Sequence, residues 1–388
     1  MAGIGLSLSS STFAVAAPLD YPSWADVQAA KSNQAAKTAE IAKIQTIVNG
    51  LEAKAAALGK VALEKGELYN QARDALNAAT AKTAKLQSQA DVAKATAAKS
   101  AKRASAMIAS LARTGGGNIS LGVLFGSARQ TDQLLAGLGT ADRLSESSQG
   151  ILRKAQFDKN AASSLAASAR TAEKKRTALA ADASDALAAA QKASAAATAQ
   201  VAQQQAAAST LFAQLATLKD TTASTEAGYQ AGVAWEAAQN AKPTPPTAPV
   251  INPNPPAPVA GAVAGAIASA EAQLGDPYEL GDMGPNSWDC SGLTKASYAA
   301  VGVYIGTHSA TNQYATMKAA GRLVNVSQLQ AGDLLFYSDG GSTSGTKYHT
   351  TMYIGGGRMI EAAYPGTNVR IAAIRYGDLV AYAGRPTG

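Results

Sequence analysis

Apolar residues recur at alternating spacings of three and four positions in the first part of the chain. This spacing places one apolar stripe along a helix, where it faces a partner helix. No proline occurs between Pro22 and Pro243, so no proline interrupts a helix in this span. We therefore predict an all-α antiparallel coiled-coil hairpin over residues 17–241. Its first seam is formed by Ile41, Ile44, Val48, Leu51, Ala55, Leu58 and Ala62.

One segment interrupts the helical pattern. Three consecutive glycines, Gly115 to Gly117, remove the local preference for helix. The apolar segment Ile119–Phe125 follows directly, and helical spacing resumes near Thr131. We predict an apolar lobe near residues 113–130, at the tip of the hairpin. The lobe is larger than an ordinary exposed turn, which favours a docking or partner-binding surface.

The pattern changes after residue 241. Eight prolines fall between Pro243 and Pro258, which predicts an extended linker over residues 242–261. Tyrosine, glycine and β-branched residues then return, with helical spacing followed by period-two alternation. We predict an α+β domain over residues 262–388. Its helices are expected at residues 263–273 and 290–301, and its strands at 333–338, 349–354, 358–363, 369–374 and 380–383.

Composition and charge narrow the function classes. The chain has 388 residues, 5% aromatic residues and a net charge of +7, with the positive excess in the helical part. A mild excess on long helices is typical of a solvated helix face and also favours polyanionic surfaces. No dense Lys/Arg block with interleaved aromatics occurs, so no nucleic-acid partner is expected.

The N-terminus resembles the end of a signal peptide. Residues 4–15 are uncharged and mostly apolar or small, and Ala14-Val15-Ala16 has the small-x-small form of a cleavage site. The basic segment that normally precedes such a run is missing. We interpret residues 1–16 as a signal peptide remnant and expect a secreted, cell wall-associated protein.

The chain holds one cysteine, Cys290, and two histidines, His308 and His349. This set is too small and too dispersed for a zinc site, so no metal is predicted. Cys290 lies at the start of a predicted helix, where unpaired N–H groups lower a thiol's pKa and favour the thiolate. A reactive nucleophile is one interpretation, and a buried structural cysteine is the other.

His349 and Glu361 lie on two strands joined by a triple-glycine turn. Partners across a hairpin are about 5 Å apart, so the carboxylate could orient the imidazole as a general base for Cys290. Taken alone, the two residues are also compatible with an exposed strand.

Several ordered motifs together resemble the NlpC/P60 cysteine peptidases over about residues 262–388. The resemblance implies a papain-like fold in which Cys290 is the nucleophile, His349 the general base and Glu361 the third polar residue. The motifs are Asp276-Pro277-Tyr278, Asp289-Cys290-Ser291-Gly292-Leu293, Leu329–Tyr337 and His349–Gly355.

The resemblance also implies a substrate-binding set and a substrate. Members of the family cleave peptidoglycan stem peptides, which implies the D-glutamyl–diamino acid amide bond here and no cofactor. His308-Ser309 lies where the family places a short polar motif lining the cleft, which implies substrate recognition. His308 is also the one rival base, but no carboxylate on a paired strand orients it. The predicted substrate-binding residues are Tyr278, Asp289, Ser291, His308 and Ser309.

The helical arm resembles a second group, the actinobacterial cell-wall hydrolases regulated by the FtsEX division complex. The segment Leu111–Leu144 carries this resemblance. It implies restraint or targeting of the enzyme by the arm during cell division, with a membrane complex as partner. Two alternatives stay open. The domain could cleave a different peptidoglycan amide bond, or it could be an idle wall-bound scaffold or adhesin.

Overall fold

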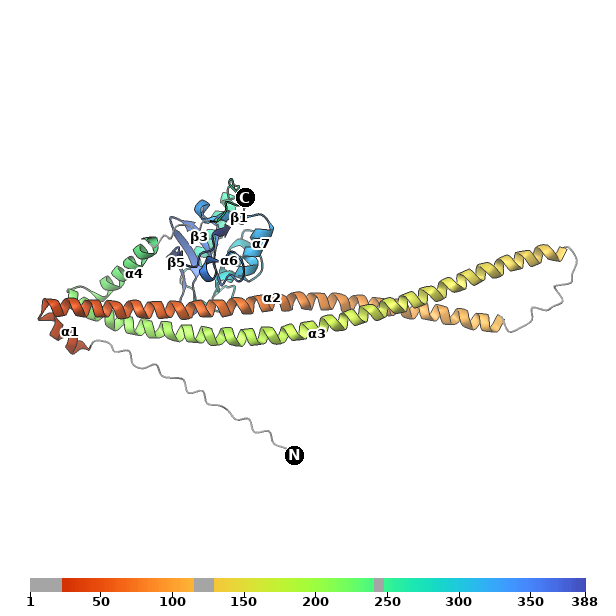
Figure 1. The fold of residues 1–388 in the computed structure, drawn as a ribbon, viewed down its shortest axis with the longest axis horizontal. Helices are drawn as coiled ribbons and strands as arrows, with labels where there is room; N and C mark the ends of the chain where they lie inside the picture. The colour runs from red at the N-terminus through yellow and green to blue at the C-terminus, as the bar shows by residue number, and fades with distance from the viewer. Residues whose placement is uncertain (1–22, 115–128, 241–247) are drawn as a thin grey trace, which may run out of the picture. The chain divides into compact units, whose positions relative to one another are not determined.

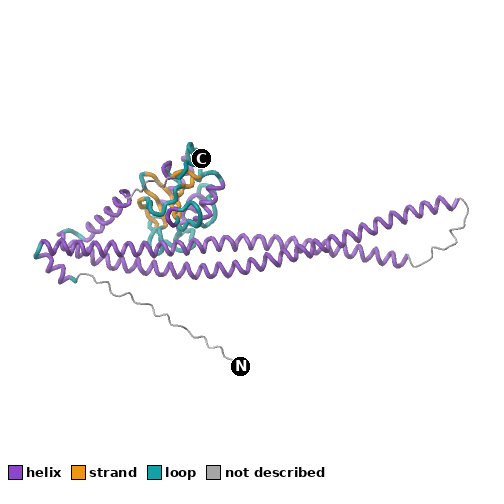
Figure 2. Tube along the Cα trace, in the orientation of Figure 1, coloured by secondary structure: helices purple, strands orange, loops and turns teal. Residues whose placement is uncertain are grey.

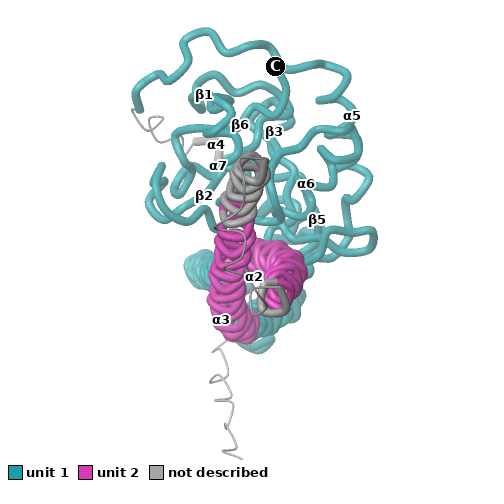
Figure 3. Tube along the Cα trace, turned by 90° about the vertical axis from the view of Figure 1, so that its right-hand side faces the viewer, with its two compact units in different colours: residues 1–67, 189–388 teal, residues 68–188 magenta. Residues whose placement is uncertain are grey.

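The computed structural model describes residues 23–114, 129–240 and 248–388. It divides into two compact units, residues 1–67 with 189–388 and residues 68–188, coloured separately in Figure 3. The predicted signal peptide remnant lies outside the described residues, as does the predicted apolar lobe except at its helical ends. Within the described ranges, no helix is both long and apolar enough to cross a membrane.

Among the described residues, four α-helices precede the C-terminal domain (Figure 1): α1 (Trp24–Lys31), α2 (Gln34–Thr114), α3 (Arg129–Lys219) and α4 (Ala223–Asn240). The long helical region agrees with the prediction, but two breaks occur without proline. Asn33 starts α2 by accepting hydrogen bonds from the amides of Ala35 and Ala36. Asp220 ends α3 with a positive φ of 58°, a conformation that helices do not contain.

In the first unit, the start of α2 packs on the end of α3. The predicted seam is buried at Ile44, Val48, Leu51, Ala55 and Ala62, whereas Ile41 and Leu58 are half-buried. An apolar cluster joins this seam to α1 and α3 through Val27, Ala30, Ala207, Leu211, Leu215 and Leu218. The close spacing of leucines on α3 gives this end of the helix pair a real apolar core.

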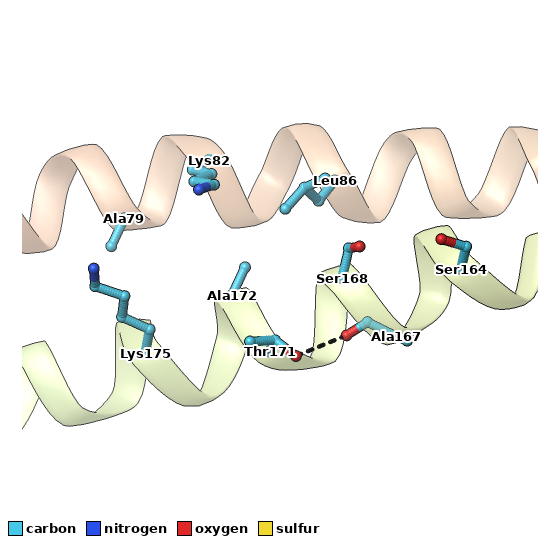
Figure 4. Close-up of a pocket in the computed structure, with 9 residues that line it drawn as sticks. All are labelled: Ala79, Lys82, Leu86, Ser164, Ala167, Ser168, Thr171, Ala172 and Lys175. Atoms are coloured by element: carbon cyan, nitrogen blue, oxygen red, sulfur yellow. Dashed lines mark hydrogen bonds between the residues drawn. The ribbon is translucent and has the colours of Figure 1, made fainter.

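In the second unit, the facing positions of α2 and α3 are mostly small or polar. Ser100 donates a hydrogen bond to the buried carboxylate of Asp158, which Lys154 also contacts at 3.1 Å. A cavity of about 560 Å³ lies between α2 and α3, where Lys82 and Leu86 of α2 face small and polar residues of α3 such as Ser168 (Figure 4). This unit therefore buries little apolar area per contact, as the alanine-rich sequence predicts.

The C-terminal domain is a six-stranded antiparallel sheet covered by three helices. The helices are α5 (Ala260–Glu271), α6 (Cys290–Ala299) and α7 (Ala310–Ala319), with short 3-10 turns η2 (Val326–Gln328) and η3 (Asp339–Gly341). The strand order is β1-β6-β2-β3-β4-β5, drawn in orange in Figure 2. The strands are β1 (Leu323–Asn325), β2 (Leu334–Tyr337), β3 (His349–Gly355), β4 (Arg358–Ala362), β5 (Val369–Ala373) and β6 (Tyr382–Gly384).

Most of these elements match the predicted ranges within a few residues, but β1 and α7 were not predicted. Helix α7 has almost no amphipathic pattern, because its buried face includes the small Ala310 and the polar Gln313. The predicted linker is also less free than an extended spacer. Its carbonyl groups at Pro249 and Pro256 accept hydrogen bonds from Tyr382 and Arg385, so the second half of the linker packs on the domain.

Candidate active site

Cys290 is the first residue of α6, and Asp289 is the cap of that helix. Asp289 Oδ1 accepts a hydrogen bond from the amide of Gly292 at 2.7 Å, which fixes the start of the helix. Its Oδ2 accepts from the amide of Gly281 at 3.0 Å. The Cys290 side chain therefore lies at a rigid helix N-terminus and is 6% exposed. Backbone N–H groups of Thr350 and Ser291 approach its sulfur.

The thiol does not have the lowered pKa that its helix position predicts. Burial raises the pKa of Cys290 well above its usual value, and the carboxylates of Asp289 and Glu67 add to this effect. The two backbone N–H groups oppose it but do not outweigh it. The prediction of a thiolate is therefore wrong for this conformation, because desolvation outweighs the helix N-terminus.

His349 opens β3, and its Nε2 lies 2.9 Å from Glu361 Oε2 on β4. Both side chains are buried, at 1% and 0% exposure. The sequence suggested that His349 and Glu361 are direct partners across the hairpin. The register instead pairs Met352 with Ile360, so Glu361 lies diagonally from His349. An ionised carboxylate accepts only, so Nε2 must carry the proton. His349 Nδ1 is buried and has no hydrogen-bond partner among the described residues, which leaves it available to Cys290.

Two arginines that sequence reasoning missed hold the same carboxylate. Arg375 contacts both oxygens of Glu361 at 2.7 Å, and Arg370 Nε contacts Oε1 at 3.2 Å. They hold the pKa of Glu361 well below its usual value, against the effect of burial. Arg370 pairs with Glu361 in the β4–β5 register, so a strand alignment could have found it. Arg375 follows the end of β5, where no pattern points to it.

Burial lowers the pKa of His349, and the Glu361 carboxylate counteracts this only in part. Arg375 and Arg370 lower it further through their positive charge. With the Cys290 pKa raised, the thiol and the imidazole are both uncharged at neutral pH in this conformation.

The structure brings His308 and Asp289 together, so this histidine does have a carboxylate partner, which comes from the cap of α6 rather than from a paired strand. His308 Nε2 lies 2.7 Å from Asp289 Oδ1, and His308 is 4% exposed. Ser291 is fully buried and also donates to Asp289 Oδ1, at 3.1 Å. The predicted substrate-binding side chains Asp289 and Ser291 thus bond within the domain. Tyr278 is also buried, and burial is the chief cause that raises its pKa; the charge of a Cys290 thiolate nearby adds to this effect.

Ser309 caps α7 and contacts a residue from the helical arm. Its hydroxyl donates to Glu67 Oε1 at 2.6 Å, and the amides of Ala310 and Thr311 donate to the same carboxylate at 2.9 and 3.1 Å. Glu67 lies on α2, in the same unit as the C-terminal domain, and is 3% exposed. Nothing in the sequence distinguishes this glutamate from the other charged residues of α2.

Neighbouring residues of α2 also contact the domain. Leu63 belongs to the domain's apolar core, and Lys60 contacts Asp339 and Asp378 at 2.6 and 2.9 Å. Two glycines explain the close approach. A Cβ on Gly59 would lie 2.5 Å from the ring of Tyr364, and one on Gly66 would lie 2.9 Å from Leu280. Helix-weakening glycines therefore occur where side chains would separate α2 from the domain.

No group of three or more His, Cys, Asp or Glu side chains that could hold a metal ion occurs in the part of the chain that the structure describes. The chemistry available at this site is that of a thiol, an imidazole and a carboxylate.

Residues 275–383 match the model of the NlpC/P60 family. This segment of the chain is an NlpC/P60 domain, as the motifs around Cys290 and His349 predict. The probable endopeptidase p60 of Listeria grayi is 39% identical over 26% of the chain and 18% of its own length. Peptidoglycan endopeptidase RipA of Mycolicibacterium smegmatis is 33% identical over 29% of the chain and 23% of its length.

Peptidoglycan endopeptidase RipB of Mycobacterium tuberculosis is 34% identical over 31% of the chain and 51% of its length. The chain thus spans at most about half the length of these curated relatives. Among solved structures, the P60 domain of antigen MAP1204 from M. avium subspecies paratuberculosis is 30% identical. That match covers 33% of this chain and 97% of the solved one, with a TM-score of 0.29.

Proposed function

We propose that the C-terminal domain is a cysteine endopeptidase that cleaves peptidoglycan stem peptides. The observation that carries this proposal is the His349–Glu361 pair, in which His349 directly precedes Thr350, whose N–H group approaches the Cys290 sulfur. The carboxylate accepts from His349 Nε2, and the unpaired Nδ1 is left as the base beside a cysteine at a helix N-terminus. The names of the relatives RipA and RipB, peptidoglycan endopeptidases, support the same substrate class.

The proposed reaction follows from these positions. His349 Nδ1 takes the thiol proton as Cys290 Sγ attacks the carbonyl carbon of the scissile amide. N–H groups at the start of α6 stabilise the oxyanion. His349 then gives its proton to the departing amine, and a thioester with Cys290 forms. A water molecule, deprotonated by His349, releases the acid and restores the thiol. Glu361 holds the imidazole and stabilises its charged form throughout.

The bond we propose is the D-glutamyl–diamino acid amide, which the family resemblance implies. A glutamate linked through its γ-carboxyl carries a free α-carboxylate next to the scissile bond. The N-terminus of α7 already holds a carboxylate, that of Glu67, with one hydroxyl and two amides. His308 and Ser309 would then help to bind substrate, as predicted.

The test is digestion of purified peptidoglycan followed by mass spectrometry of the released fragments. The wild-type protein should release fragments that end at D-glutamate, and Cys290→Ala should release none while keeping its fold. Fragments ending at another position would assign a different amide bond. No release by the wild type under any activating condition would support the idle scaffold or adhesin instead.

We further propose that α2 restrains the enzyme by occupying the substrate side of the site. Glu67 fills the carboxylate pocket, and Leu63 packs in the same apolar cluster as Cys290 and Tyr278. Opposite charges two helical turns apart, Lys60 and Glu67, each meet complementary groups of the domain. A stem peptide cannot reach the α7 N-terminus while Glu67 is bound there.

Two glycines of α2 give a matched test of this restraint. Alanine favours helix over glycine by about 1 kcal/mol, so both variants should strengthen α2 itself. Gly59→Ala places a methyl group against the Tyr364 ring, whereas a Cβ on Gly50 meets nothing within 4 Å. Gly59→Ala should therefore raise the initial rate of peptidoglycan cleavage, and Gly50→Ala should not. If Gly59→Ala and Gly50→Ala cleave peptidoglycan at the same rate, the arm does not restrain the enzyme and serves only to target it.

In the cell, we propose that the protein is exported, associates with the wall and acts in division. A membrane complex similar to FtsEX would release the domain by binding the arm, with residues 113–130 as the predicted contact. Co-purification of the full chain with such a complex, compared with a chain lacking residues 113–130, tests this partner.

A further inference from the structure

The third residue of the site, Glu361, is held by more than the histidine it orients. Four donor groups converge on its two oxygens: His349 Nε2, two nitrogens of Arg375 and Arg370 Nε. The carboxylate is fully buried, whereas the two arginine side chains are 43% and 42% exposed. The arginines therefore keep part of their hydration while neutralising a charge that burial would otherwise make costly.

Arg375 and Arg370 do not contribute equally. Arg375 binds both oxygens at 2.7 Å in a fork, a geometry that fixes the plane of the carboxylate as well as its position. Arg370 makes one contact, at 3.2 Å. With the plane fixed, Oε2 faces His349 Nε2 and the tautomer with a free Nδ1 is selected.

The charge of Arg375 also acts on the histidine. The titratable groups that face His349 are Glu361 on β4, Arg370 on β5, Arg375 beyond β5 and Tyr337 on β2. Cys290 on α6 lies next to them, since the N–H group of Thr350 approaches its sulfur. The guanidinium also lies over the Tyr337 ring, 5.2 Å from its centroid. Glu361 favours a protonated imidazole, and the two arginines oppose it.

We propose that Arg375 is a positioning residue of the peptidase site: its fork aligns Glu361 with His349 Nε2, and its charge opposes proton uptake by the Cys290–His349 pair. This inference rests on the proposed Cys290–His349–Glu361 function. Without Arg375, the Glu361 carboxylate stabilises the imidazolium more strongly. The Cys290–His349 pair therefore releases its first proton at a higher pH. The sign follows from the lost positive charge near His349, which no longer opposes protonation of the imidazole.

The experiment uses the full-length protein and measures the rate of Cys290 alkylation by iodoacetamide from about pH 5 to 10. Cys290 is the only cysteine in the chain, so the signal is unambiguous. Peptidoglycan cleavage is measured on the same samples, with thermal unfolding as a check on the fold. The variants are Arg375→Met, Arg375→Lys and Arg370→Gln. Arg358→Gln, an exposed arginine on β4, is the matched control for loss of one positive charge.

Arg375→Met should move the acidic limb of the alkylation profile upward by roughly one pH unit, which is about a tenfold loss of reactive pair on that limb. Arg375→Lys keeps the charge but loses the fork, so its limb should stay near wild type while cleavage falls several-fold. Arg370→Gln should shift the limb less, and Arg358→Gln should not shift it.

An unchanged limb in a folded Arg375→Met protein would overturn the proposal, even if cleavage falls. If that variant does not fold, Arg375→Lys decides, since wild-type cleavage by it would exclude a role for the fork. The alkylation readout needs no substrate, so these outcomes are separate from a failure of the proposed function. That failure would appear as a wild-type protein that alkylates normally but releases no stem peptides.

Discussion

Glu67 and Ser309 are 242 positions apart in the chain and lie 2.6 Å from each other, carboxylate oxygen to hydroxyl. The contact joins the helical arm to the N-terminus of α7, next to His308 and Asp289 of the candidate site. A carboxylate from the protein itself thus occupies the position that we assign to the substrate's carboxylate.

We expect Glu67→Gln to activate the full-length protein. A glutamine keeps the shape but loses the charge, and hydrogen bonds to a charged group are worth about 1.5–3 kcal/mol. The fraction of released enzyme, and with it the initial cleavage rate, should rise by roughly one order of magnitude. Asp91→Asn, an exposed carboxylate farther along α2, is the control and should leave the rate unchanged. An unchanged rate for Glu67→Gln would mean that this contact does not maintain the closed state.

The pH dependence of Cys290 reactivity should report the same contact. Burial and the Asp289 and Glu67 carboxylates raise the Cys290 pKa, so the thiol is protonated at neutral pH and its alkylation midpoint should lie above the ordinary value of about 8.5. Glu67→Gln removes one negative charge, and Gly59→Ala loosens the burial. Both changes favour the thiolate, so the midpoint should fall in each variant. A midpoint that rises or stays constant would contradict this account of the resting site.

Cleavage kinetics and Cys290 alkylation together should distinguish the roles of the two histidines. His349→Ala removes the base and should lower cleavage by about two to four orders of magnitude. It should also abolish the fast alkylation of Cys290 at neutral pH in the Gly59→Ala background. His308→Ala breaks the contact with Asp289 and should mainly raise KM, with alkylation of Cys290 preserved. The reverse pattern would make His308 the base.

The pairing of His349 with Glu361 and the helix start at Cys290 could be predicted from the sequence, because both depend on local motifs. Cys290 follows a capping aspartate, and His349 and Glu361 flank a short turn, so both relationships fall within a few residues of a recognisable element. The strands other than β1 were also predictable, because each alternates or is largely apolar, whereas β1 has only three residues and shows no such pattern. Helix α7 was not, since Gln313 on its buried face bonds to Ser291 and Thr294 instead of presenting an apolar side chain.

The contacts that we propose to restrain and tune the site could not be predicted. Glu67 is one of many charged residues on α2, and only the packing of α2 against the domain gives it a role. Gly59 and Gly66 pointed to this packing only weakly. Isolated glycines in a long helix indicate that another segment lies close, but they do not show which one. The raised Cys290 pKa has the same origin, since a helix N-terminus is visible in the sequence, whereas the burial of Cys290 and the nearby Glu67 carboxylate are not.

The last prediction is which substitution of Glu361, by glutamine or by alanine, lowers cleavage more. From the sequence alone, glutamine is the milder change because it keeps one acceptor oxygen. In the structure, both carboxylate oxygens face donors only, two from Arg375, one from Arg370 and one from His349. A glutamine must therefore aim its NH₂ group at an arginine or at His349 Nε2–H, and a buried donor facing a donor costs about 1–3 kcal/mol. We expect Glu361→Gln to lower cleavage at least as much as Glu361→Ala and to lower the melting temperature as well. Both are measured on full-length protein, with Glu279→Gln, which lies outside this cluster, as the control for the substitution itself. If Glu361→Gln cleaves peptidoglycan at close to the wild-type rate, the four donors do not define the orientation of His349, and the charge of Glu361 is dispensable for the base.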